Sequence, residues 1–214
     1  AAIHEAAAST MTVPARLRVF GAGNALAVTG ILAGWIAAAH ATGEPGEPGD
    51  AVETRPAPIN ACELLSPAAV AEATGSAAQP GIRRDAGYTS EGAYSSSCIW
   101  ILDGDNTATD HAAPFGGRNF VILNAMRWPE GSGLADTFLQ AFHEAAAIGE
   151  IPGAPVSRDY GDAALWWGDG IAVRTGDVSF GLSVVLRGVE PGHPGEFEER
   201  LAPAILRQIA ASTE

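Results

Sequence analysis

The sequence contains no lysine, so all 12 of its basic residues are arginines, and 25 carboxylates outnumber them. The formal net charge is −13. A surface this acidic repels nucleic acid and anionic lipid headgroups, which makes both poor partners. The simpler explanation of the charge is solubility.

Cysteine is scarce as well. Cys62 and Cys98 are too few for a disulfide-rich scaffold, but two is the number that a single bond requires. If they pair, the segment 60–75 is attached to the apolar run 98–102. The segment begins Asn60-Ala61-Cys62. The remainder of the domain would then pack against the unit that this segment and the run 98–102 form together.

Charge is absent from residues 19–39, a run of 21 residues that follows Arg16 and Arg18. The run ends at Ala39-His40-Ala41, a small-x-small site of the kind that signal peptidase cleaves. We therefore predict that residues 11–41 are a signal peptide cleaved after Ala41. The alternative is an uncleaved membrane anchor, because 21 uncharged residues can span a bilayer.

In both cases the rest of the chain is exported, to the periplasm or cell envelope. Residues 1–10 precede the first methionine and are set apart as upstream sequence. Residues 42–58 are rich in proline, glycine and acid, and we predict a solvated linker. Residues 59–214 are expected to form one domain, large enough to bury a single core.

Within that domain the hydrophobic periodicity predicts an α+β fold, an antiparallel sheet with helices packed on one face. Ser66 and Pro67 mark a helix start, and apolar residues on both faces of 118–128 favour a central strand. Pro203 is expected to kink or split the last helix. The predicted elements are helices over 68–74, 132–147 and about 196–211, and strands over 98–102, 118–128, 163–167, 171–175 and 178–187.

Two halves of the domain are similar in order, each with a helix and then a strand that carries tryptophan and ends in a Gly/Asp turn. These strands contain Trp100 and Trp167. A diverged internal duplication is a possible explanation of this order.

The pattern Cys62-x-Leu64-Leu65-Ser66, followed by Cys98-x-Trp100, resembles a family of exported bacterial domains of unknown function. Many of them are actinobacterial lipoproteins. The resemblance covers roughly residues 62–209 and implies an exported α+β domain with a disulfide between Cys62 and Cys98, but no reaction or ligand. The chain departs from the lipoprotein pattern because Trp35 follows Leu32-Ala33-Gly34, where the acylated cysteine would be.

The candidates for chemistry are weak. Asp103, Asp105 and Asp110 resemble the start of a calcium loop, but Ala108 and Pro114 stand where glycine and glutamate are needed. We interpret this segment as a polar loop, and we expect no metal and no cofactor. His111, His143 and His193 have no recognisable nucleophile motif beside them, so no catalytic residue is predicted.

Trp166 and Trp167 are adjacent, so on a strand their side chains must point to opposite faces. We predict that Trp167, in phase with Leu165, faces the helix-covered core and that Trp166 lies on a more open side. An exposed tryptophan can stack on a sugar ring or a peptide side chain. Trp166 and the nearby Asp169 are therefore the candidate binding residues, although packing of both tryptophans is the plainer alternative.

Together these patterns favour a non-catalytic binding or interaction module of the cell envelope, not an enzyme. Its partner would be an envelope protein or a cell-wall component. The membrane would be contacted only through an uncleaved leader. The alternatives are a periplasmic hydrolase, which would bring two of the three histidines together with a carboxylate, and a calcium-dependent adhesion domain.

Overall fold

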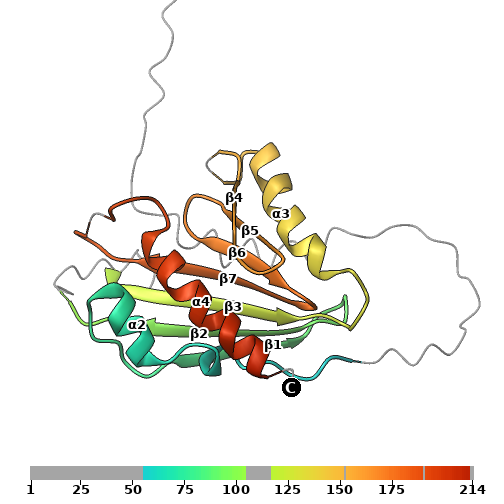
Figure 1. Cartoon of the computed structure of the whole chain (residues 1–214), viewed down its shortest axis with the longest axis horizontal. Coiled ribbons are helices and arrows are strands. Elements are labelled where there is room, and N and C mark those ends of the chain that lie inside the picture. Colours follow the sequence, from blue (N-terminus) through green and yellow to red (C-terminus); the bar gives the residue numbers. More distant parts are fainter. Residues whose placement is uncertain (1–54, 105–116, 152, 190, 213–214) are drawn as a thin grey trace, which may run out of the picture.

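The structure is a computed structural model that describes residues 55–104, 117–151, 153–189 and 191–212 (Figure 1). The predicted leader and most of the linker lie outside these residues. No helix within the described ranges is long and apolar enough to cross a membrane. The elements in chain order are η2 (Ala61–Glu63), α2 (Pro67–Thr74), β1 (Ile82–Tyr88), β2 (Tyr94–Ile101), β3 (Phe120–Arg127), α3 (Ala135–Ala147), β4 (Val156–Arg158), β5 (Ala163–Trp166), β6 (Ile171–Thr175), β7 (Val178–Val185) and α4 (Glu196–Ala211).

The strands form one antiparallel sheet in the order β1-β2-β3-β7-β6-β5-β4. The α+β class and the antiparallel sheet are therefore confirmed. β3 lies between β2 and β7, which confirms its central place. Its residues are buried on both faces, apart from the partly buried Asn124 and Arg127.

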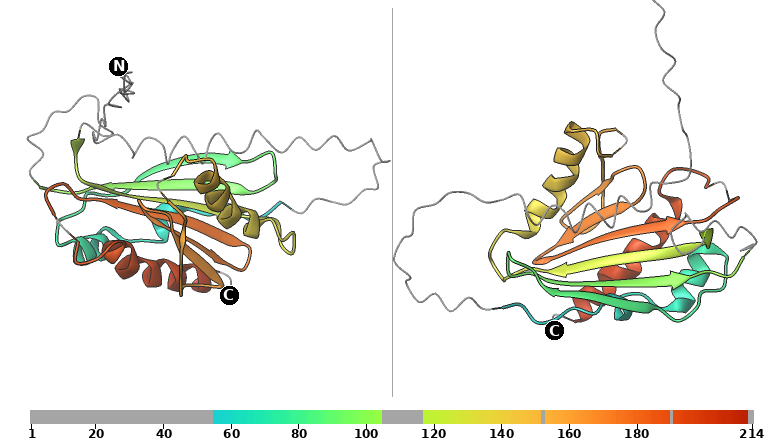
Figure 2. Two further views of the ribbon diagram at one scale, coloured as in Figure 1. Left: turned by 90° about the horizontal axis from the view of Figure 1, so that it is seen from above. Right: turned by 180° about the vertical axis from the view of Figure 1, so that it is seen from behind.

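The helices divide between the two faces of the sheet (Figure 2). Leu201 and Ile205 of α4 and Val70 of α2 share one buried cluster, which also contains Ala164 of β5. Phe142 of α3 belongs to a second cluster with Leu165, the next residue along β5. Since neighbouring strand residues point to opposite faces, the two clusters lie on opposite sides. The expectation of helices on one face is wrong for α3, because β5 and β6 bury apolar side chains on both faces, with Leu165 and Ala172 on the side of α3.

The two edge strands were not predicted. β1 carries Arg83, Arg84 and Asp85, and six of its seven residues are exposed, so it shows no apolar alternation. β4 has only three residues, and it lies between the predicted helix 132–147 and the predicted strand 163–167. Charge and short length protect sheet edges from pairing with other chains, and they also remove the periodic signal that identifies a strand.

α4 runs unbroken from Glu196 to Ala211, so Pro203 does not split it. A proline inside a helix removes one backbone hydrogen bond. Leu201, Ala202 and Ile205 on either side of it are almost completely buried. This burial against the sheet offsets the missing bond.

The predicted disulfide is present: Cys62 and Cys98 are bonded, with their Cα atoms 5.0 Å apart. It joins η2 to β2, and the Ala61 backbone N–H donates to Ser96 Oγ at 3.0 Å beside it.

The start of α2 is also as predicted, because Ser66 Oγ accepts from the Ala69 N–H at 3.1 Å and Pro67 occupies the first turn. In the segment that precedes η2, the Pro56 carbonyl accepts a hydrogen bond from Tyr88 Oη of β1 at 3.0 Å.

Candidate functional site

The two adjacent tryptophans have the environments that the strand period predicts. Trp167 is 3% exposed and stacks on Phe142 of α3, with ring centroids 4.7 Å apart. Trp166 points to the opposite face and is only partly buried. That face is less open than expected, because the first turn of α4 reaches it.

Trp166 lies at the edge of the sheet beside an exposed apolar side chain. Its cross-strand partner is Val156 of β4, which is 52% exposed. On the other side the indole approaches Gly195, the residue that precedes α4, so closely that a Cβ there would lie 3.0 Å from a ring carbon. Gly195 also has a left-handed backbone with φ of 87°. The ring is thus held against the α4 N-terminus and leaves an apolar platform with Val156.

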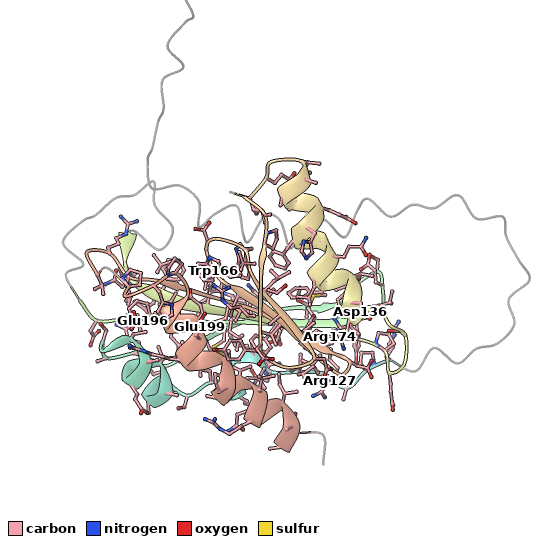
Figure 3. All side chains as sticks on the ribbon, turned by 45° about the horizontal axis from the view of Figure 1, so that its top comes forward. Arg127, Asp136, Trp166, Arg174, Glu196 and Glu199 are labelled. Atoms are coloured by element: carbon pink, nitrogen blue, oxygen red, sulfur yellow. A yellow bond between two sulfur atoms is a disulfide. The ribbon has the colours of Figure 1, made fainter. Side chains whose placement is uncertain are left out.

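Charged and polar groups surround this platform (Figure 3). Arg158 Nε pairs with Glu199 Oε1 at 3.0 Å, which ties β4 to α4. His193 Nδ1 lies 4.0 Å from the other oxygen of Glu199. Burial raises the pKa of Tyr160, and the nearby Glu199 carboxylate adds to the shift. Arg158 and Glu199 each keep about a quarter of the side chain exposed, so they are accessible to a ligand.

A buried carboxyl group lies beneath the same surface. Glu198 in the first turn of α4 is 3% exposed, and its Oε1 accepts from the Val184 N–H at 2.8 Å. Burial raises the pKa of Glu198 to about 7, and the Glu199 and Asp169 carboxylates add to the shift. Partial burial also raises the pKa of Asp169, in the hairpin turn after Trp167. The structure thus brings the two predicted binding residues, Trp166 and Asp169, to the same end of α4.

The histidines do not form a catalytic group within the described residues. His143 is exposed on α3, and His193 lies before α4, on the opposite side of the sheet. His111 lies outside the described ranges. Among the residues that the structure describes, no three histidine, cysteine, aspartate or glutamate side chains are arranged to hold a metal ion. Asp105 and Asp110 of the calcium alternative are outside those residues too.

Sequence reasoning identified the tryptophan but missed the groups around it. Glu198, Glu199 and Arg158 were interpreted only as helix or loop residues. One signal was available, the three acids in the first turn of α4. It does not indicate that β4 pairs beside β5, which is what brings Arg158 to Glu199.

Comparison with family models, curated proteins and solved structures finds no match to this chain.

Proposed function

We propose that this chain is an exported, non-catalytic binding module of the cell envelope, and that it binds a cell-wall component or an envelope protein through the Trp166 surface. The proposal includes the signal peptide and secretion that the leader pattern predicts. The Cys62–Cys98 disulfide is compatible with an oxidising location outside the cytoplasm.

The observation that carries the proposal is the fixed, partly exposed indole of Trp166 beside Val156 and the Glu199 carboxylate. A flat ring against an apolar platform suits a sugar ring or a planar side chain, and carboxylates accept the hydrogen bonds of hydroxyl or amino groups on such a ligand. Because Arg158 and the α4 N-terminus hold these groups in place, little entropy is lost on binding.

The test is co-sedimentation of the oxidised domain with isolated cell walls, and capture of envelope proteins on the immobilised domain. Trp166→Ala should weaken binding by about 2- to 12-fold, the equivalent of the 0.5–1.5 kcal/mol that an aromatic contact adds beyond its buried area. Glu199→Gln should also weaken it. The matched control is Glu144→Gln on α3, which removes one exposed carboxylate on the other face. Unfolding curves must show that each variant is folded, and unchanged binding by folded Trp166→Ala would refute the proposal.

A further inference from the structure

The first turn of α4 is attached to the sheet by one buried polar side chain. Within residues 196–199 only Glu198 is buried, with 3% of its surface exposed. Its Oε1 accepts from the Val184 N–H of β7 at 2.8 Å. The side chains of α4 that belong to the buried apolar cluster begin at Leu201. The position of the first turn therefore depends on this carboxyl group, whereas apolar packing holds the remainder of the helix.

The same turn holds the Trp166 surface together. Gly195 precedes the turn, and a Cβ at this position would lie 3.0 Å from the indole ring and 3.6 Å from Glu199 Oε1. Glu199 in turn pairs with Arg158 of β4 at 3.0 Å. Figure 3 shows Trp166 and Glu199 at this end of α4. A movement of the first turn away from the sheet would separate the carboxylate from the ring.

No basic side chain in the described part of the chain contacts the Glu198 carboxyl group. The charged groups on the elements around it are Glu196, Glu199 and Arg200 of α4, Arg158 of β4, Asp169 in the hairpin turn after β5 and His193 in the loop before α4. Both arginines pair with the other carboxylates of α4, and Asp169 adds a further negative charge. Burial and these neighbours raise the pKa of Glu198 to about 7, although two backbone N–H groups favour the ionised form.

We propose that Glu198 is a pH-sensitive switch: its neutral carboxyl group keeps the first turn of α4 on β7, and its ionisation releases this turn and disrupts the Trp166 surface. A carboxylate that is buried without a cation is costly. Lifting the first turn hydrates it at little cost, because no other buried side chain of α4 has to move before Leu201.

The pH window follows from the two states of the turn. In the released turn Glu198 is hydrated and recovers its ordinary pKa of 4.5, whereas in the closed turn this pKa is about 7. The folded value is the raised one, so the stabilisation of the closed turn is complete below pH 4.5 and is lost as the pH rises through about 7. The Arg158–Glu199 pair opposes release, but a pair whose partners are each about a quarter exposed adds little.

The switch would regulate binding. A ligand that contacts both Trp166 and Glu199 needs the closed turn, because release separates these two groups. Its affinity therefore falls with the fraction of molecules in the closed state. The surface would hold its ligand near pH 5 and release it by pH 8. This consequence rests on the proposed function, whereas the release of the turn does not.

Amide hydrogen exchange of the oxidised protein between pH 5 and pH 8 tests the switch without a ligand. The reporters are the Val184 N–H, which donates to Glu198, and the Glu199 N–H, which donates to the Gly195 carbonyl. After correction for the intrinsic exchange rate, their protection factors should fall by roughly 50- to 100-fold, as pKa values of 4.5 and about 7 require. At pH 8 they should be less protected than the amides of β3, which exchange through full unfolding.

Glu198→Gln should limit the fall to a few-fold, because the amide oxygen accepts from Val184 but does not ionise. Asp169 and His193 still titrate in this variant and account for the remainder. The matched control, Glu144→Gln on α3, should show the full fall. Reporters as protected as β3 at pH 8, or a fall that persists undiminished in Glu198→Gln, would overturn the proposal. If Glu198→Gln does not fold, the comparison with β3 in the parent protein decides alone.

Binding to isolated cell walls is measured separately at pH 5.5 and pH 8. It should weaken with pH in the parent protein more than in Glu198→Gln, which controls for titration of the walls themselves. An exchange result as expected with an equal change of binding in both proteins would overturn the link between the switch and the Trp166 surface. Unchanged binding by folded Trp166→Ala would refute the proposed function, and the exchange measurement would still decide whether the turn is released.

Discussion

At the scale of single residues, the two adjacent tryptophans have opposite roles. Trp167 fills the space between β5 and α3 and stacks on Phe142. Trp167→Ala would leave a cavity that α3 cannot fill without moving, so the free energy of unfolding should fall by about 3–5 kcal/mol. Denaturant unfolding curves measure it. Trp166→Ala, which removes a half-buried ring, should cost less, and an equal or larger loss would contradict this assignment.

Glu198 should make stability depend on pH. Burial raises the pKa of Glu198 from 4.5 to about 7, so the folded state holds this proton more tightly than the unfolded chain does. The stabilisation is complete below pH 4.5 and is lost as the pH rises through about 7. Between pH 5 and pH 8 the free energy of unfolding should fall by up to about 3 kcal/mol, because a tenfold change in proton affinity corresponds to ~1.4 kcal/mol.

The measurement is a series of denaturant curves across this pH range. Glu198→Gln should weaken the dependence, because the amide oxygen still accepts from Val184 but does not titrate. The contribution of Asp169, whose pKa burial also raises, remains in this variant. Asp85 does not interfere, since its contact with Arg83 lowers the pKa of this carboxyl and places its titration below the range. Glu144→Gln, on the exposed face of α3, should leave the slope as it is. A slope unchanged by Glu198→Gln would contradict the prediction.

At the scale of elements, the disulfide holds η2 and α2 on the sheet. It closes a loop of 36 residues, and such a loop is worth roughly 3–4 kcal/mol on the chain-entropy model. Reduction should lower the free energy of unfolding by that amount, with thiols counted after denaturation. Two free thiols in the denatured, unreduced protein would contradict the bond.

The packing around the disulfide leaves no space for a side chain at position 81. A Cβ on Gly81 would lie 2.5 Å from Cys98 Sγ and 2.9 Å from Trp100 Nε1. The loop between α2 and β1 therefore passes directly over the bond, and only glycine leaves room for it.

Some elements could be predicted from the sequence because their signal is local. β6 was predicted with its observed bounds, β5 and β7 to within two residues, and α4 from its i+4 apolar stripe. The phase of Trp166 and Trp167 also follows from the period of two. β1, β4 and the surroundings of Trp166 depend on which strands become neighbours. The pairing of strands depends on contacts between residues far apart in the sequence, for example Arg158 with Glu199, and a local pattern does not contain this information.

At the scale of the whole molecule, the sheet has two arms that meet at β7. One consists of α2 followed by β1, β2 and β3, and the other of α3 followed by β4, β5 and β6. Each arm runs from an edge strand inward. β3 and β6 are parallel to each other, and α2 and α3 lie on opposite faces. A half-turn about the axis of β7 would produce this arrangement from one unit. Internal duplication stays a prediction, and this arrangement gives it a specific symmetry.

The contacts at the start of the domain determine how it responds to force. A pull on the linker first meets the hydrogen bond from Tyr88 to Pro56, then the buried Ile59, and then the covalent link from Cys62 to Cys98. The load therefore passes to β2, which is paired on both sides, before it can act on α2. The linker also touches the edge strand β1 through Tyr88, but that contact is a hydrogen bond, which breaks long before the covalent link to β2 does. A domain attached in this way keeps its sheet intact while its tether is stretched.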